Sequence, residues 1–188
     1  MRFRSASYEE ATLPIAILLL VVIPVLGPGQ SDKGPDVWEP MRYFAGSWTG
    51  TGKGQPGSST IEREYQFVLN GKFLHVKNKS VYPPQKENPK GEVHEDSGFL
   101  SYDRARKLFV LRQFHGEGFV NQYALDRAAS NARVLVFVSE SIENIPAGWR
   151  ARETYRIINA NEFTETFELA APGKDFELYS EGHFNRRR

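Results

Sequence analysis

Residues 60–83, TIEREYQFVLNGKFLHVKNKSVYP, decide the fold class. In the first half, apolar residues such as Ile61 and Tyr65 alternate with charged or polar residues. Such alternation is typical of a strand with one buried face and one wet face. The dipeptide Asn70-Gly71 follows, and it favours the positive φ angles of a two-residue hairpin turn. The stretch therefore predicts two antiparallel strands joined by a tight turn.

The same pattern recurs from Gly46 to near the end of the chain. The ten predicted strands span 47–53, 60–69, 72–83, 92–103, 106–115, 118–126, 132–140, 149–158, 162–170 and 175–184. One apolar face per strand favours antiparallel pairing, and no predicted helix covers an open sheet. The sequence therefore predicts an all-β fold, an antiparallel up-and-down barrel of roughly ten strands. Because about eight strands already suffice to enclose one small ligand, the wider barrel predicts an interior pocket.

The N-terminal segment differs from the rest of the chain. Arg2 and Arg4 precede an uncharged apolar stretch over 13–26, LPIAILLLVVIPVL, and Gly27-Pro28-Gly29 follows it. A basic start, an apolar stretch of about 7–15 residues and small residues after it are typical of a secretory signal peptide. We expect residues 1–29 to direct export to the periplasm or the outside of the cell. The alternative is an uncleaved membrane anchor through 13–26.

Two further boundaries follow from the composition. Residues 30–45 are predicted to be a polar linker and a short helical turn, which Pro40 restricts in length. Residues 46–188 are predicted to form the barrel domain.

Composition excludes several classes of function. The chain has 24 Lys and Arg against 23 Asp and Glu, a net charge of +1, which argues against nucleic-acid binding through bulk charge. Cysteine is absent, which excludes disulfides, thiolate metal sites and a cysteine nucleophile. No Gly-x-Ser-x-Gly motif, phosphate-binding loop or His-Glu-x-x-His motif occurs. A binding protein is therefore favoured over an enzyme.

Three motifs carry a resemblance to a known family. They are Gly46-Ser47-Trp48-Thr49-Gly50-Thr51-Gly52, Asn70-Gly71-Lys72-Phe73-Leu74 and Val93-His94-Glu95-Asp96-Ser97-Gly98-Phe99-Leu100. Together they resemble the nitrobindin-like haem-binding β-barrels of the lipocalin and fatty-acid-binding-protein (calycin) superfamily, and related domains of unknown function. The resemblance implies a ten-stranded barrel with an apolar pocket.

The resemblance also implies a cofactor. Nitrobindins hold a b-type haem whose iron is bound by one histidine near the C-terminus, and they bind nitric oxide and isomerise peroxynitrite to nitrate. The matching position in this chain is His183, which the resemblance implies as the metal ligand. Alternation along the last strand points His183 outward with Glu181, whereas a bulge at Gly182 would turn it inward.

Trp48 is expected to have a structural role. The glycine before it permits a tight entry into the first strand, and the indole is expected to plug the closed end of the barrel. The terminal Arg186-Arg187-Arg188 is either a solvated tail or lies against Trp48.

Arg63 falls on the same side of its predicted strand as the apolar residues, so we expect it inside the barrel with Tyr65 and Phe67. A buried guanidinium needs an anionic partner. That partner is either Glu153 or Glu165, which lie in phase with apolar residues of their own strands, or the carboxylate of a ligand. The second alternative is the arrangement of fatty-acid-binding barrels.

The same alternation predicts the orientation of the remaining histidines. Adjacent strand residues face opposite sides, so either His94 with Asp96, or Glu95 alone, points into the barrel. We expect His75 to face outward and His115 to lie at the rim.

The sequence thus predicts an exported barrel that binds a small hydrophobic or amphipathic ligand, with haem b as the named candidate. The alternatives are a haem-dependent peroxynitrite isomerase and a carrier of fatty acids or lipids that uses an internal arginine. The candidate ligand- or cofactor-binding residues are His183, His94, Arg63, Tyr65 and Phe67, with His183 as the metal ligand. Arg112, in phase with the apolar Leu108, Val110 and Phe114, is a second candidate interior arginine.

Overall fold

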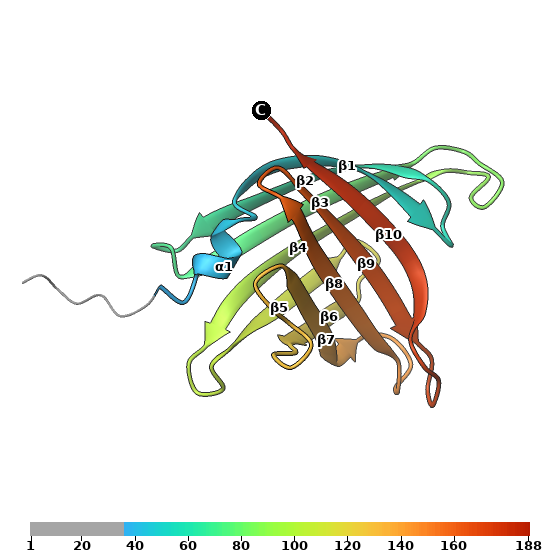
Figure 1. Ribbon diagram of the computed structural model, residues 1–188. Helices are drawn as coiled ribbons and strands as arrows, with labels where there is room; N and C mark the ends of the chain where they lie inside the picture. Colours follow the sequence, from blue (N-terminus) through green and yellow to red (C-terminus); the bar gives the residue numbers. More distant parts are fainter. Residues whose placement is uncertain (1–35) are drawn as a thin grey trace, which may run out of the picture. The chain divides into compact units, whose positions relative to one another are not determined.

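A computed structural model of the protein describes residues 36–188, which form a closed barrel of ten antiparallel strands and one short helix (Figure 1). The elements are α1 (Glu39–Arg42), β1 (Gly46–Gly54), β2 (Ser59–Val68), β3 (Phe73–Tyr82), β4 (Glu92–Asp103), β5 (Leu108–His115), β6 (Val120–Leu125), β7 (Val134–Glu143), β8 (Arg150–Asn159), β9 (Glu162–Ala170) and β10 (Glu177–Arg186). Each strand pairs with the next in sequence, and β10 pairs with β1 to close the barrel. The predicted all-β barrel is confirmed.

The predicted signal segment, residues 1–29, lies outside the described residues, and its role in export stays a prediction. From Asp36 onward, no helix has the length and apolar character that a membrane crossing requires.

The strand ends agree with the predicted ones to within three residues. The turn at Asn70-Gly71 is different, because Val68 and Phe73 are the last paired residues and four residues separate them. Leu69, Asn70 and Gly71 have φ angles of 51°, 59° and 72°. A two-residue turn was therefore the wrong prediction. Consecutive left-handed residues, which Asn and Gly tolerate best, build a wider turn here.

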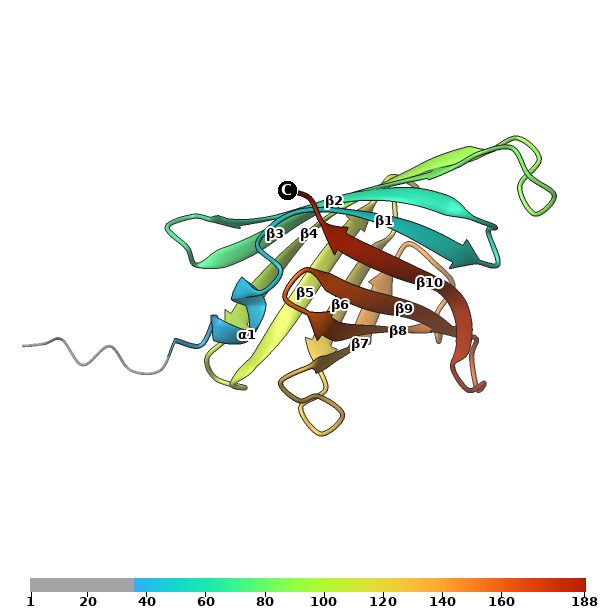
Figure 2. The ribbon, with the colours of Figure 1, turned by 45° about the horizontal axis from the view of Figure 1, so that its top comes forward.

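One end of the barrel is closed by α1 and Trp48. Figures 1 and 2 both show α1 beside the β2–β3 turn, while the β3–β4 loop projects at the opposite end. Trp48 is 1% exposed, and its indole N–H donates a hydrogen bond to the Phe44 carbonyl at 2.7 Å. The Arg186 guanidinium lies 4.2 Å from the Trp48 ring centroid and donates hydrogen bonds to the Tyr43 and Ala45 carbonyls. The predicted plug is confirmed, and of the two alternatives for the terminal arginines the structure has Arg186 against Trp48.

Apolar side chains fill the half of the interior next to α1. Phe163 stacks on Phe184 with ring centroids 4.6 Å apart, and Trp48 meets Phe163 edge to face. Other buried residues of this layer include Met41, Phe44, Tyr65, Leu74, Val76, Leu100, Leu111, Tyr123, Leu135, Phe137 and Tyr155. They leave a void of only about 20 Å³. Any ligand space must therefore lie in the other half.

The phase predicted for the fifth strand is wrong. Phe109, Leu111 and Gln113 face the interior, whereas Arg112 is exposed and its Nε donates to the Gln122 side chain at 2.9 Å. Apolar residues occupy both faces of β5, so alternation alone did not distinguish them. Pairing with β4 decides the face, because Leu111 lies opposite the buried Leu100. Arg112 is therefore not an interior arginine.

Candidate binding cavity

A cavity of about 590 Å³ occupies the half of the barrel away from Trp48. Its lining includes Ser59 at the start of β2, Tyr82 at the end of β3 and Tyr179 near the start of β10, which are the strand ends far from α1. Small-molecule sites in proteins have volumes of about 300–1,000 Å³. The cavity is therefore large enough for one small ligand.

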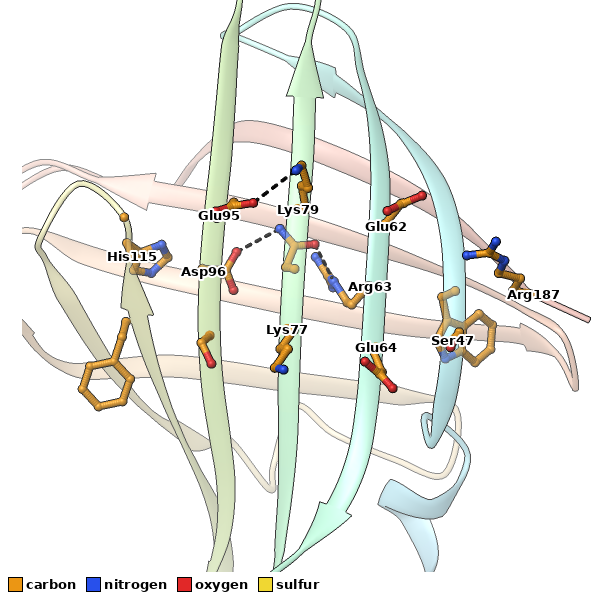
Figure 3. Close-up of a pocket in the computed structure, with 15 residues that line it drawn as sticks. Ser47, Glu62, Arg63, Glu64, Lys77, Lys79, Glu95, Asp96, His115 and Arg187 are labelled. Carbon is orange, nitrogen blue, oxygen red and sulfur yellow. Dashed lines mark hydrogen bonds and ion pairs between the residues drawn. The ribbon is translucent and has the colours of Figure 1, made fainter.

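The floor of the cavity is a belt of polar side chains at mid-height of the barrel, which we call the polar ring. Its members are Arg63, Asn78, Asp96, Gln113, Asn121, Glu153 and Glu165, one each from β2, β3, β4, β5, β6, β8 and β9. Figure 3 labels two of them, Arg63 on β2 and Asp96 on β4. The Nε of Arg63 donates to Asn78 Oδ1 at 2.9 Å, and Asn78 Nδ2 donates to Asp96 Oδ2 at 2.9 Å.

Arg63 forms an ion pair with Glu165 across the interior. The two side chains are 9% and 13% exposed, and the guanidinium lies 4.4 Å from the centroid of the Phe184 ring. Of the two expectations for Arg63, the structure has the internal ion pair, with Glu165 as the partner.

Glu153 is a buried carboxyl group in the polar ring. Burial, and then the nearby charge of Glu165, raise the pKa of Glu153 from 4.5 to about 8. The Tyr155 hydroxyl donates a hydrogen bond to Glu153 Oε2 at 2.6 Å. Glu153 is therefore mostly protonated at neutral pH, and its carboxyl O–H can donate a hydrogen bond.

Asp96, by contrast, is ionised. Burial alone would raise the pKa of Asp96, but the hydrogen bond from His94 and the charge of Arg63 outweigh burial and lower it. The polar ring thus contains three carboxyl groups and one guanidinium, of which Asp96 and the Arg63–Glu165 pair carry the charges.

Three acceptor oxygens of the polar ring are buried without a hydrogen-bond partner among residues 36–188: Asp96 Oδ1, Gln113 Oε1 and Asn121 Oδ1. They come from the adjacent strands β4, β5 and β6, and Gln113 is the cross-strand partner of Asn121. A buried polar atom without a partner costs about 1–3 kcal/mol. Such atoms grouped on one wall mark a place where hydrogen-bond donors are needed.

The mouth of the cavity is mainly apolar. The side chains above the polar ring include Ile61, Phe119, Ile142, Ile145, Pro146, Trp149, Phe167 and Leu169. A ligand in this cavity therefore meets polar groups at its inner end and apolar groups at its outer end.

Two of the four histidines of the chain, His94 and His115, line the cavity near its mouth. His94 Nδ1 lies 2.7 Å from Glu117 Oε1, and His94 Nε2 lies 3.5 Å from Asp96 Oδ2. The hydrogen bond to Asp96 and the one to Glu117 raise the pKa of His94 to about 9, against the opposing effect of burial. Burial lowers the pKa of His115, so that ring is neutral. Of the two alternatives for this strand, the structure has His94 and Asp96 facing the cavity, and Glu95 does not line it.

His183 lies on the outer surface of the barrel. Its side chain is 47% exposed, and Nε2 lies 2.7 Å from Glu162 Oε1. Pairing with β9 is regular through Gly182 and His183, and the irregularity of β10 lies instead between Leu178 and Ser180. The next residue, Phe184, fills the interior, so His183 does not face the cavity.

The other predicted site residues lie below or outside the cavity. Tyr65 is in the apolar layer beneath Arg63, and Phe67 packs against Trp38 near α1 with ring centroids 5.4 Å apart. His75 faces outward, as expected, and its Nε2 lies 2.8 Å from Ser97 Oγ. Of the residues singled out as candidates for ligand binding, the cavity is lined by Arg63 and His94.

Sequence reasoning missed Asn78, Gln113, Asn121 and Glu117. Asn78 lies on the same face of β3 as Leu74 and Val76. A polar residue on an otherwise apolar face could have indicated an interior polar site. Asn121 shows the same pattern ahead of Tyr123. Glu117 lies in a turn, where no periodicity indicates the direction of a side chain.

No family model and no curated protein matches the sequence. Solved structures do resemble the barrel. The crystal structure of Rv2717c from M. tuberculosis has a TM-score of 0.60 and 18% identity, covering 82% of this chain and 99% of that one. A de novo designed fluorescence-activating β-barrel has a TM-score of 0.41 and 12% identity, covering 78% and 95%. The similarity to Rv2717c supports the overall fold of the chain.

Proposed function

We propose that this protein binds one small amphipathic molecule inside the barrel, with its polar group on the polar ring and its apolar body at the mouth. The observation that carries the proposal is the division of the 590 Å³ cavity into a polar floor and an apolar mouth. A structural barrel of this size would bury apolar side chains in that space. Here the floor of the cavity is instead lined by ionisable and amide side chains, and three of their acceptor oxygens have no hydrogen-bond partner within residues 36–188.

The polar ring favours a particular kind of polar group. Arg63 is already neutralised by Glu165, and Asp96 and Glu153 add two more carboxyl groups. An anionic head group would add charge beside these carboxyl groups without a free cation in the ring. A neutral or cationic group with N–H or O–H donors would instead satisfy Asp96 Oδ1 and its neighbouring acceptors. The ligand class is thus an apolar amine or alcohol rather than a fatty acid.

Haem is a second candidate, supported by the motifs that resemble nitrobindin. The residue that this resemblance nominates does not fit the role, because His183 lies outside the barrel and bonds to Glu162. Haem binding and peroxynitrite isomerisation stay predictions. A haemin titration tests haem binding, and a Soret band that survives His183→Ala would assign the iron to another ligand.

A displacement assay tests the proposed ligand class. The full-length protein is titrated with the apolar fluorophore N-phenyl-1-naphthylamine, which is then displaced with dodecylamine, dodecanol or laurate at constant pH. We expect saturable binding of the fluorophore, and displacement by the amine and the alcohol at lower concentrations than by laurate. Absence of saturable binding would refute the ligand-binding function. Preferential displacement by laurate would support the fatty-acid alternative.

A matched pair of variants ties the result to the polar ring. Gln113→Leu removes an unpartnered acceptor inside the cavity, whereas Gln122→Leu makes the same change on the outer face beside Arg112. We expect Gln113→Leu to weaken the binding of the amine and of the alcohol by about 0.5–1.5 kcal/mol, the contribution of one hydrogen bond. Gln122→Leu should leave both affinities unchanged. Equal effects would place the ligand elsewhere.

A further inference from the structure

We propose that His94, His115 and Glu117 form a binding site for one divalent transition-metal ion of the Zn²⁺ type at the mouth of the cavity. Their ligand atoms lie within 4.8 Å of one another. Two imidazoles and one carboxylate are ligands that Zn²⁺ accepts, and three protein ligands leave a fourth tetrahedral position open. Because all three residues line the cavity, the ion would lie in its wall.

The backbone holds these residues in place without a metal. His94 is on β4, and His115 ends β5 directly opposite Asp96. The turn after β5 is fixed by hydrogen bonds from Gly116 N to Glu95 O at 2.9 Å and from His115 N to Phe119 O at 3.1 Å. Glu117 therefore projects from a short, hydrogen-bonded turn next to His94, rather than from a mobile loop.

A second observation also indicates that this cluster binds a metal ion. His115 Nδ1 is buried and has no hydrogen-bond partner among residues 36–188. The ring cannot swing away freely, because it stacks on Phe119 with centroids 4.0 Å apart. A metal ion would provide the partner that Nδ1 lacks.

The residues around the cluster provide the support that metal-binding histidines usually have. Such histidines donate their other ring N–H to a carboxylate or carbonyl oxygen. His94 Nε2 is 3.5 Å from Asp96 Oδ2, and His115 Nε2 is 3.3 Å from the Asn121 amide group. Rotation of that amide by half a turn would bring Asn121 Oδ1, now without a partner, towards Nε2–H. The same rotation turns Asn121 Nδ2 away from the Tyr123 hydroxyl, to which it donates at 2.8 Å, so that this hydroxyl would donate to Oδ1 instead.

Titration with Zn²⁺ tests the site in the absence of any organic ligand, so its result is independent of the proposed function. Isothermal titration of the full-length, chelator-treated protein should show one saturable site, and Co²⁺ should bind there too. Ca²⁺ should not compete, because it prefers six to eight oxygen ligands. Absence of saturable Zn²⁺ binding, or full competition by Ca²⁺, would overturn the proposal.

Five single variants locate the site. His94→Ala and His115→Ala should each weaken Zn²⁺ binding by about tenfold or more, since even outer-shell losses have that effect. His75→Ala and His183→Ala remove the two outward histidines and should not change the affinity. Circular dichroism checks that each variant is folded. In case His115→Ala does not fold, Glu117→Gln, in the exposed turn, is expected to weaken binding by itself. Loss in His183→Ala, or none in Glu117→Gln, would overturn the assignment.

Discussion

Arg63 and Glu165, 102 residues apart in sequence, form an ion pair inside the barrel, in the layer that separates the apolar core from the cavity. Both side chains are almost fully buried. Their arrangement sets the charge of the cavity floor, because the guanidinium is already committed to a protein carboxylate. The same pair makes the stability of the barrel sensitive to the loss of either partner.

Arg63→Met should destabilise the protein by about 3–5 kcal/mol, because it leaves the Glu165 carboxylate buried without its cation. Arg63→Met with Glu165→Gln removes both charges and should recover a substantial part of that loss. Urea denaturation of the two variants and the wild type measures the difference. If the double variant were no more stable than Arg63→Met, the pair would not be coupled.

Trp48→Ala should cost about 3–5 kcal/mol of unfolding free energy, as aromatic truncation in a core does. The indole is fully buried, bonds to the Phe44 carbonyl and lies under the Arg186 guanidinium. Trp149→Ala is the matched control, since that side chain is 38% exposed at the mouth and should cost far less. Similar losses in both variants, measured by urea denaturation, would contradict the plug at the closed end.

The sequence was sufficient for the barrel but not for the site. Alternation in residues 60–83 locates strands, because one side of each strand must be apolar. The same rule led to Arg63, a charged residue in an apolar phase. It failed at β5, where Arg112 and Gln113 compete for the interior and only pairing with β4 decides. Alternation could not predict that Glu117 lies next to His94. Glu117 is in a turn, and its position depends on the geometry of that turn and on the pairing of strands, which no local sequence pattern indicates.

His183→Ala should have little effect on the binding of a ligand in the cavity. The imidazole is on the outer face and bonds to Glu162, an exposed pair of the kind that contributes about 0–1 kcal/mol to stability. The measurement is the affinity for N-phenyl-1-naphthylamine in the wild type and in the variant. A clear loss of affinity in a folded His183→Ala protein would show that β10 turns this residue inward when a ligand binds.

The buried carboxyl group of Glu153 should make the protein less stable as pH rises. An unfolded glutamate ionises near pH 4.5, whereas folded Glu153 keeps its proton up to about pH 8. Between these values the folded state binds more protons, so the free energy of unfolding falls with increasing pH and levels off above about 8. The contribution of this one group is at most about 1.4 kcal/mol per pH unit. Glu153→Gln keeps the shape of the protonated side chain and removes its titration.

Urea denaturation across this pH range, for the wild type and for Glu153→Gln, isolates the contribution of Glu153 from that of all other groups. The difference in unfolding free energy between the two proteins should grow steadily in favour of the variant as pH rises, and become constant above about pH 8. Two parallel stability curves would mean that Glu153 is already ionised in the folded protein. In that case the cavity floor would carry one more negative charge, and a cationic ligand would be favoured over a neutral one.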